Sequence, residues 1–158
     1  MLEKLLGRVR AAFFRAMAAA IAAAFAFWVA HEFLGHPQPV FAAIAALICL
    51  APGVSDHLKQ ALGLMLGVTL GIVVGELTLL VPHDYGEVRM AVATFASMML
   101  ASLFGLSAVV PIQAGASAML VLLLGPQNAG LVRFLDVSVG ALVGVAVTLL
   151  FFRPRPGS

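Results

Sequence analysis

The stretch Gly63-Leu-Met-Leu-Gly67-Val-Thr-Leu-Gly71-Ile-Val-Val-Gly75-Glu76 places a glycine at every fourth position of an otherwise apolar run. Four residues advance about 400° around a helix with 3.6 residues per turn, so the glycines form one slowly drifting row. Glycine lowers helix stability by roughly 0.5–1 kcal/mol relative to alanine, and close approach of another backbone within lipid compensates for that loss. We therefore predict a membrane-spanning helix that packs through its glycine face. Thr69 and Glu76 should lie on the opposite face.

Composition places the whole chain in the membrane class. Its 158 residues are 63% hydrophobic and 10% charged, with a mean hydropathy of +1.11, which lies outside the range of ordinary soluble domains. A spanning helix requires about 20 residues, so there is room for six spans with short loops and no soluble domain. The formal net charge of +2 is small and dispersed and gives no indication of nucleic-acid binding. The single cysteine, Cys49, excludes an intrachain disulfide and is expected to be a small core residue.

Apolar segments separated by polar turns predict the six spans. The first follows a short basic amphipathic lead, and a signal peptide is the alternative interpretation of this segment. The second span is short, so its helix is expected to begin within His36-Pro37 or to be broken. The predicted spans cover about residues 11–30, 40–51, from after Lys59 to 81, 88–104, 108–124 and 131–152, with polar turns or loops at 31–39, 55–59, 82–87 and 125–128.

Lysine and arginine residues are unevenly distributed between the two sides of this arrangement. Two of them, Arg89 and Arg133, fall on one side. The side that carries the excess of positive charge is normally cytoplasmic, so we expect a multi-pass protein of the bacterial inner membrane with both termini in the cytoplasm. The seven residues on that side are Lys4, Arg8, Arg10, Arg15, Lys59, Arg153 and Arg155.

The two halves of the chain, about 11–81 and 88–152, are predicted to repeat. Because each unit has three spans, an odd number, the second unit must be inverted relative to the first. Transporters with inverted repeats and proline-interrupted helices bind their substrate near the midplane, where the repeats meet. The chain is therefore expected to be one all-α membrane domain, residues 1–158, made of two inverted three-helix repeats. Shifts of 74 or 73 positions relate Arg15 to Arg89, Pro37 to Pro111, Pro52 to Pro126, Gly67 to Gly140 and Gly71 to Gly144.

Several motifs, taken in this order and spacing, resemble the membrane half of the fusaric acid resistance protein-like family, a relative of the aromatic acid exporters and of plant aluminium-activated malate transporters. The resemblance covers nearly the whole chain. It rests on Arg15-Ala-Met-Ala-Ala-Ala, on His36-Pro37 followed by Phe41-Ala-Ala-Ile-Ala-Ala-Leu, on the glycine stretch from Leu62 to Glu76, on Gln113-Ala-Gly-Ala-Ser-Ala-Met-Leu-Val, and on Arg133-Phe-Leu-Asp-Val-Ser-Val-Gly-Ala-Leu-Val-Gly144.

The resemblance implies passage or export of organic anions, often aromatic carboxylates, through a six-span unit that is duplicated or dimerised. Many members of the family add a cytosolic helical domain after the sixth span. This sequence ends at Ser158, so regulation placed in that domain is expected to be absent and a homodimer is expected.

Two polar groups within the spans are candidates for substrate binding. Arg133 and Asp136 are three positions apart and hence neighbours on one helical face. They are interpreted either as a structural intrahelical pair or as an anion-facing arginine that the aspartate partly offsets. Gln113 follows Pro111, where proline frees a backbone carbonyl, so Gln113 either binds a substrate carboxylate or joins neighbouring helices.

Other charged residues near the span ends have two interpretations each. Arg15 is interpreted as a residue that sets the membrane topology. Arg89 is expected either to attract an anion at the outer side of the protein or to extend its side chain to the membrane–water interface. Glu76 is an ionisable group at membrane depth, which makes it a candidate for proton coupling. Alternatively, Glu76 reaches headgroup water or pairs with Arg89 or Arg133.

The segment His31-Glu-Phe-Leu-Gly-His36 superficially resembles a zinc-protease signature. That motif requires histidines four apart on one helix, whereas these are five apart and Gly35-His36-Pro37 should break the helix. We expect no enzyme, no catalytic residue, no cofactor and no metal. A weak metal site or pH-sensitive gate at His83, Asp84 and Glu87 is the alternative to solvated loop residues.

The sequence therefore predicts a dimeric membrane protein that passes small organic anions, with membrane lipid as its surroundings and no nucleic-acid partner. Arg89 and Arg133 would draw anions toward a site near Pro37, Pro111 and Gln113. Two alternatives stay open: a non-transporting scaffold that binds a partner, and an anion channel in place of a carrier. Convergence of polar residues on one cavity favours transport. The residues assigned to helix packing are Gly63, Gly67, Gly71, Gly75, Gly140 and Gly144.

Overall fold

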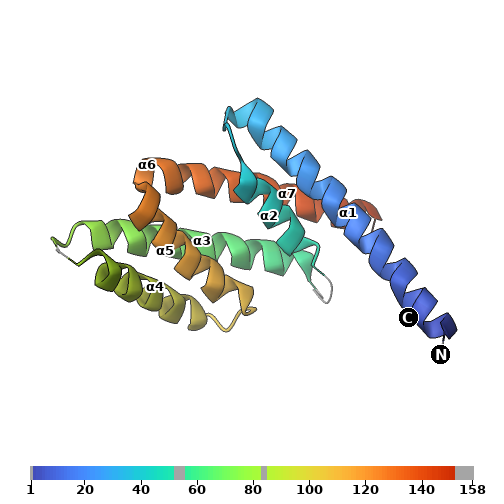
Figure 1. Ribbon diagram of the computed structural model, residues 1–158, viewed down its shortest axis with the longest axis horizontal. Coiled ribbons are helices and arrows are strands. Elements are labelled where there is room, and N and C mark those ends of the chain that lie inside the picture. The colour runs from blue at the N-terminus through green and yellow to red at the C-terminus, as the bar shows by residue number, and fades with distance from the viewer. Residues whose placement is uncertain (1, 52–55, 83–84, 152–158) are drawn as a thin grey trace.

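The structure, a computed structural model, describes residues 2–51, 56–82 and 85–151, and all regular secondary structure in these ranges is helical (Figure 1). The all-α prediction is confirmed. Predictions that involve Pro52, Ser55, His83, Asp84, Phe152, Arg153 or Arg155 lie outside the described residues. The helices are α1 (Leu2–Leu34), α2 (Val40–Cys49), α3 (His57–Leu79), α4 (Gly86–Ser102), α5 (Val109–Leu124), α6 (Pro126–Ala129) and α7 (Leu131–Phe151).

Six of these helices occupy the positions of the six predicted spans. Three described segments are long and apolar enough to cross a membrane: Lys4–Leu34, His57–Leu79 and Pro126–Phe151. The helix α2 has only 10 residues. At 1.5 Å per residue it is about 15 Å long, half of a hydrocarbon core of roughly 30 Å. The short second span is therefore a half-length helix within the described chain.

Three predicted boundaries were wrong. The basic lead and the first span form one continuous helix, which also includes His31 and ends at Leu34. Gly35, with φ +65°, ends it, as expected for the Gly35-His36-Pro37 segment. The predicted loop after Ser55 is shorter than expected because the Asp56 side chain accepts a hydrogen bond from the Lys59 backbone N–H (3.0 Å) and so caps α3. The predicted turn 125–128 contains most of the short helix α6.

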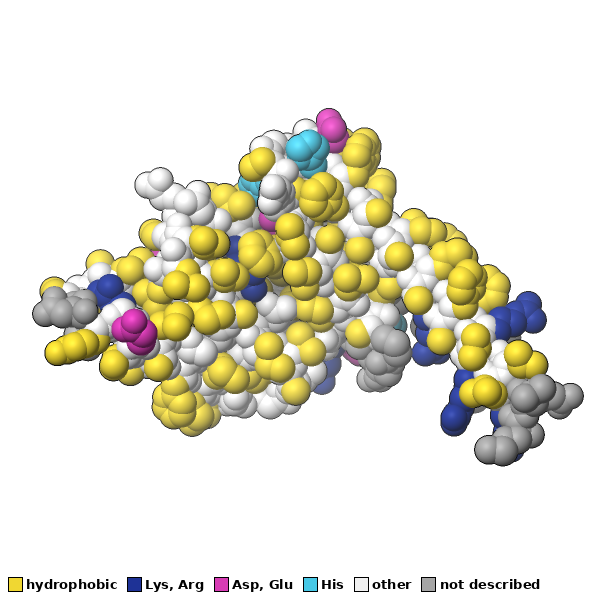
Figure 2. Space-filling model, in the orientation of Figure 1, with side chains coloured by type: hydrophobic (Ala, Val, Ile, Leu, Met, Phe, Trp, Pro, Cys, Tyr) yellow, Lys and Arg dark blue, Asp and Glu magenta, His cyan; other side chains and the backbone are white. Residues whose placement is uncertain are grey.

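Two long helices organise the bundle. The helix α3 packs against α4, α5 and α7, whereas α7 packs against α1, α2 and α3. The N-terminal part of α1 extends beyond the other helices (Figure 1). Hydrophobic side chains cover most of the face shown in Figure 2, and Lys and Arg side chains gather near the start of α1. This distribution suits helices that are surrounded by lipid.

The glycine row of α3 lies against α5. A Cβ added to Gly71 would lie 2.1 Å from the backbone oxygen of Ala114, and one added to Gly67 would lie 2.5 Å from that of Val110. Only a residue without a side chain permits this approach. On the other face of α3, Thr69 is exposed. Gly63, Gly67, Gly71 and Gly75 are all buried, and Glu76 is exposed.

A second glycine pair makes equivalent contacts between α7 and α2. A Cβ added to Gly140 would lie 2.1 Å from the backbone oxygen of Ala42, and one added to Gly144 would lie 2.6 Å from Cβ of Cys49. Cys49 is fully buried, in agreement with its expected core position. The two closest helix pairs, α3 with α5 and α7 with α2, therefore use the same glycine-on-small-residue contact.

Candidate functional site

Arg133 lies in the first turn of α7 and is only 3% exposed. Its Nε donates a hydrogen bond to Oγ of Ser117 (3.0 Å), and its Nη2 donates one to Oε1 of Gln113 (2.9 Å), both on α5. Its guanidinium lies over the ring of Phe41 on α2, with Cζ 4.1 Å from the ring centroid. The buried Nη1 has no hydrogen-bond partner. Arg133 thus carries a buried charge with one donor still unused.

Arg133 and Gln113 line a cavity of about 210 Å³ between α2, α3, α5 and α7. The cavity is smaller than the roughly 300–1,000 Å³ of sites for drug-sized ligands, so it suits a compact molecule. All of its other lining residues are apolar: Phe41, Ile44, Ala45, Leu64, Ala116, Leu120 and Val137. A cavity with one cationic wall and one apolar wall matches a small amphipathic anion.

Asp136 does not pair with Arg133. Its Oδ1 lies 2.5 Å from Nδ1 of His36 in the loop between α1 and α2. Among the described residues, Asp136 therefore forms its ion pair with His36. The predicted intrahelical pair is therefore corrected: the two side chains three positions apart turn to different neighbours. Asp136 is 1% exposed, so its partner compensates for burial of the carboxylate.

Two residues near the site had not been assigned to it from the sequence. His36 was considered only as part of a metal motif, although the resemblance already included His36-Pro37. Phe41 opens the Phe41-Ala-Ala-Ile segment, and its contact with Arg133 joins α2 to α7. Nothing in local spacing indicates either contact, because both residues are far from α7 in the chain.

The proline positions expected near the site differ in their surroundings. Pro111 lies in the first turn of α5, two residues before Gln113. Pro37 is exposed in the loop between α1 and α2 and does not line the cavity. Of the residues expected near the anion site, Gln113 and Arg133 line the cavity, whereas Asp136, Arg89 and Pro37 do not.

Glu76 lies one turn before the end of α3 and is exposed. It forms no ion pair with Arg89 or Arg133. Its Oε1 would lie 3.0 Å from a Cβ added to Gly130, so the carboxylate sits beside the junction of α6 and α7. Glu76 therefore lies outside the Arg133 cavity, with access to the surroundings of the bundle.

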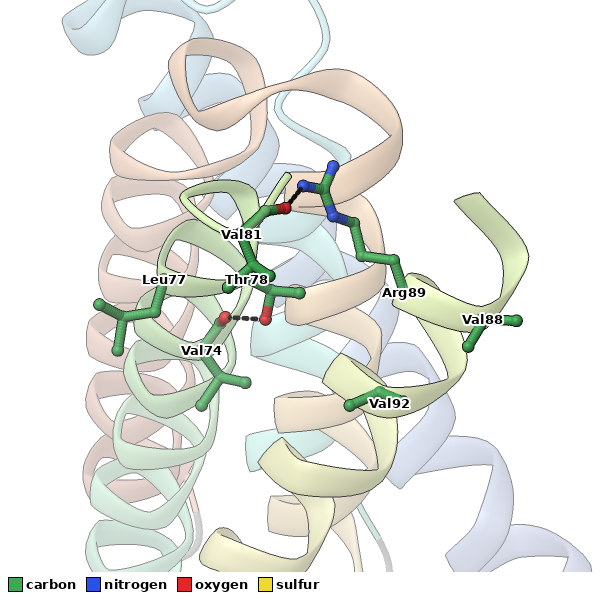
Figure 3. Close-up of a pocket in the computed structure, with 7 residues that line it drawn as sticks. All are labelled: Val74, Leu77, Thr78, Val81, Val88, Arg89 and Val92. Carbon is green, nitrogen blue, oxygen red and sulfur yellow. Dashed lines mark hydrogen bonds between the residues drawn. The ribbon is translucent and has the colours of Figure 1, made fainter. Parts of the chain in front are cut away.

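Arg89 belongs to a separate groove between α3 and α4 (Figure 3). Its Nη2 donates to the backbone oxygen of Val81 and, at 3.5 Å, to that of Leu79. It does not line the Arg133 cavity. The expectation that both arginines act near one site is thus not matched by their positions: Arg133 is buried in the bundle, and Arg89 lies at its edge.

No group of three or more His, Cys, Asp or Glu side chains among the described residues is placed to hold a metal ion. His83 and Asp84 lie outside the described residues, so the alternative of a metal site with Glu87 keeps its place as a sequence-based interpretation.

Comparison with known proteins identifies relatives. An uncharacterised protein of Corynebacterium glutamicum is 31% identical over 145 residues, which cover 90% of this chain and 37% of the relative. Proteins of Mycobacterium bovis and Mycobacterium tuberculosis that bear the name "Putative arylamide transporter" are 30% identical over 143 residues, 86% of this chain and 40% of theirs. The chain thus spans about two fifths of the length of these relatives. No solved structure matches it.

The family comparison agrees with the fold and with the sequence motifs. A family model described as fusaric acid resistance protein-like matches residues 21–147, which include the C-terminal part of α1, the whole of α2 to α6 and most of α7. The chain belongs to the fusaric acid resistance protein-like family of membrane proteins.

Proposed function

We propose that the chain moves small organic anions across the membrane and that Arg133 is the group that binds the anion. The observation that carries this proposal is the buried guanidinium with a partner-free Nη1 beside a cavity. Its contacts are neutral, namely Gln113, Ser117 and the ring of Phe41. A buried charge without a counterion in contact is costly, and a bound anion would supply one. Asp136, one turn away, offsets part of the charge and so keeps anion binding reversible.

Aromatic carboxylates are the proposed substrate class. The carboxylate would accept hydrogen bonds from Arg133 and Gln113, which line the polar wall. The ring would contact the apolar wall, which includes Phe41 and Leu64. The mycobacterial relatives are named for arylamides, which share the ring but carry no charge. A desolvated guanidinium favours the charged compound, so we expect carboxylate over amide and, given the family name, export over import.

The reciprocal glycine contacts support a twofold relation between the two three-helix units. Gly71 corresponds by its contacts to Gly140, 69 positions later, and Ala42 corresponds to Ala114, 72 positions later. A twofold relation produces such exchanged contacts, since each unit presents the same surface to the other. This register differs from the expected shift of 73 positions, which relates Gly67 to Gly140. We therefore retain the inverted repeat as a proposal, with the correspondence between the two units that these glycine contacts give.

In that register, the cavity lies where equivalent positions of the two units face each other. Arg133 corresponds to Leu64 and Gln113 corresponds to Phe41, and all four line the cavity. The second unit thus supplies both polar lining residues, Gln113 and Arg133, whereas both units contribute apolar ones. Inverted-repeat transporters place their sites at this kind of interface.

The remaining proposals concern the surroundings of this unit. The distribution of Lys and Arg favours the bacterial inner membrane with both termini in the cytoplasm. The resemblance to a family whose six-span unit is duplicated or dimerised is the basis for proposing a homodimer within membrane lipid. Transport of this type uses binding and conformational change, so the proposal includes no catalytic residue, no cofactor, no metal and no nucleic acid.

Flux into or out of proteoliposomes tests the proposal. The purified protein would be reconstituted, and movement of radiolabelled benzoate would be followed under an imposed membrane potential, with benzamide as the uncharged comparison. Replacing Arg133→Gln should lower affinity for benzoate by roughly tenfold to a hundredfold, because a hydrogen bond to a charged group contributes about 1.5–3 kcal/mol. Arg15→Gln, an exposed arginine on α1, serves as the matched control and should leave flux unchanged.

The alternatives predict other outcomes of the same experiment. Equal flux for wild type and Arg133→Gln would contradict the site. No benzoate flux from folded protein would favour the scaffold. Flux that does not saturate with benzoate concentration would favour a channel over a carrier, whereas saturation supports a binding step.

A further inference from the structure

A surface groove of about 440 Å³ runs between the C-terminal end of α3 and the N-terminal end of α4. Figure 3 shows side chains of both helices along it. Most of the residues that line it are branched aliphatics, and Leu77, Val81, Val88 and Val92 are each more than half exposed. The groove is therefore open and apolar, and it lies on the outside of the bundle. Its lining residues are Val74, Leu77, Thr78, Val81, Val88, Arg89 and Val92.

Arg89 closes one end of this groove. Its side chain reaches from α4 toward α3, and the dashed line in Figure 3 marks its hydrogen bond to Val81. The carbonyls of Val81 and Leu79, at the negative end of the α3 dipole, hold the guanidinium there. Its Nε is buried and has no hydrogen-bond partner. Arg89 thus places a fixed positive charge, with one unused N–H donor, at the end of the apolar groove.

The position of the groove suits a lipid of the surrounding bilayer. It ends where α3 stops and α4 starts, which is the level at which a spanning helix leaves the hydrocarbon core. A phospholipid that lies along the two helices would put an acyl chain on the valines and its phosphate at the level of Arg89. Apolar contact with the acyl chain and attraction between the phosphate and Arg89 are the two components of lipid affinity.

We propose that the α3–α4 groove binds an anionic phospholipid, with one acyl chain between Val74 and Val92 and the phosphate at the guanidinium of Arg89. This site is separate from the Arg133 cavity, and the inference does not depend on the proposed transport. Among the residues that the structure describes, Glu87, exposed in the first turn of α4, is a nearby charge that opposes an anion. The electrostatic contribution to lipid binding can therefore be tested in both directions, by removing the charge of Glu87 or that of Arg89.

Native mass spectrometry of the detergent-purified protein measures the binding. The probes are phosphatidylglycerol and phosphatidylcholine with identical acyl chains. Wild type should retain phosphatidylglycerol about fivefold better, and Arg89→Gln should remove this preference, since one basic residue near a membrane surface contributes a factor of that size. Glu87→Gln should increase it. Arg15→Gln, the charge-matched control on α1, should leave it unchanged.

A second pair of variants tests the apolar channel. Val92→Trp should fill the groove and lower retention of both lipids. Leu142→Trp, at an exposed apolar position of α7, is the control and should retain both. Arg133→Gln should lower the affinity for benzoate but keep the lipid preference, so failure of one proposal is distinguishable from failure of the other.

Three outcomes would overturn the lipid site. The first is an unchanged lipid preference in Arg89→Gln, a variant that keeps the channel intact. The second is equal retention in Val92→Trp and Leu142→Trp. The third is a change from dimer to monomer in Val92→Trp with lipid retained, which would assign the groove to a second copy of the chain.

Discussion

Nδ1 of His36 lies 2.5 Å from Oδ1 of Asp136, although the two residues are 100 positions apart. This contact joins the loop between α1 and α2 to the middle of the bundle, one turn from Arg133. His31 supports the loop, because its Nδ1 donates to the backbone oxygen of His36 (2.9 Å). The pair therefore fixes both the loop and the Asp136 carboxylate on α7.

Removal of His36 should destabilise the protein strongly. His36→Ala leaves Asp136 buried without its partner, and breaking a buried ion pair in this way costs about 3–5 kcal/mol. The additional change Asp136→Asn should restore part of the loss, because the uncompensated charge is removed. Thermal unfolding in detergent measures both. The control is His31→Ala, an exposed position, which should cost much less. A wild-type unfolding temperature in His36→Ala would contradict the structural role.

The glycine contacts should tolerate no side chain. In Gly71→Ala and Gly140→Ala, the new Cβ would lie 2.1 Å from a backbone oxygen of the facing helix. The helices must then separate, and overpacking of this kind costs about 1–3 kcal/mol. Unfolding temperature and the size-exclusion profile in detergent report the change.

Gly7→Ala is the matched control, because a Cβ at Gly7 meets nothing within 4 Å. It should be neutral or should stabilise α1 by roughly 0.5–1 kcal/mol, the usual gain for alanine over glycine in a helix. If Gly71→Ala behaves like Gly7→Ala, close packing of α3 on α5 is not required.

Phe41 should affect substrate affinity through both Arg133 and the apolar wall. Phe41→Leu keeps most of the apolar surface but removes the cation–π contact, which contributes about 0.5–2 kcal/mol. We expect the benzoate concentration at half-maximal flux to change severalfold, whereas Phe41→Tyr should behave like wild type. Ile44→Val, in the same cavity wall, is the control for a small change of volume. Equal values for Phe41→Leu and Phe41→Tyr would argue against a role for the ring.

Glu76 remains the candidate for proton coupling. It is an ionisable group on a spanning helix, and its carboxylate lies beside Gly130 at the start of α7. Glu76→Gln should make benzoate flux independent of an imposed pH gradient while leaving its response to membrane potential. Glu87→Gln, another exposed carboxylate, should keep the dependence. A gradient dependence that survives in Glu76→Gln would remove this residue from the mechanism.

The proposed orientation can be checked with the single native cysteine. Cys49 is buried and should not react with a membrane-impermeant maleimide. In a Cys49→Ala background, Lys4→Cys should be labelled only in inverted vesicles and Gln127→Cys only in intact cells, since both positions are exposed at opposite ends of the predicted topology. The reverse pattern would place the termini outside.

The sequence by itself determined the properties that depend on local composition and spacing. Apolar runs predicted the helices, because every backbone group in lipid must be satisfied within its own segment. The four-residue glycine period predicted which face of α3 is buried, since helix geometry alone sets that face. The order of the motifs indicated the family, which the comparison confirmed.

Only the tertiary structure decided which distant side chains meet. Sequence spacing suggested that Asp136 would offset Arg133, but Asp136 contacts His36 instead, because a loop distant in sequence offers a better-placed partner. Arg133 and Gln113 share a cavity, whereas Arg89 and Glu76 lie elsewhere. Helical periodicity fixes the face on which a residue lies, but the partner on that face depends on how α2, α5 and α7 approach one another, and that approach is set by packing between segments far apart in the chain.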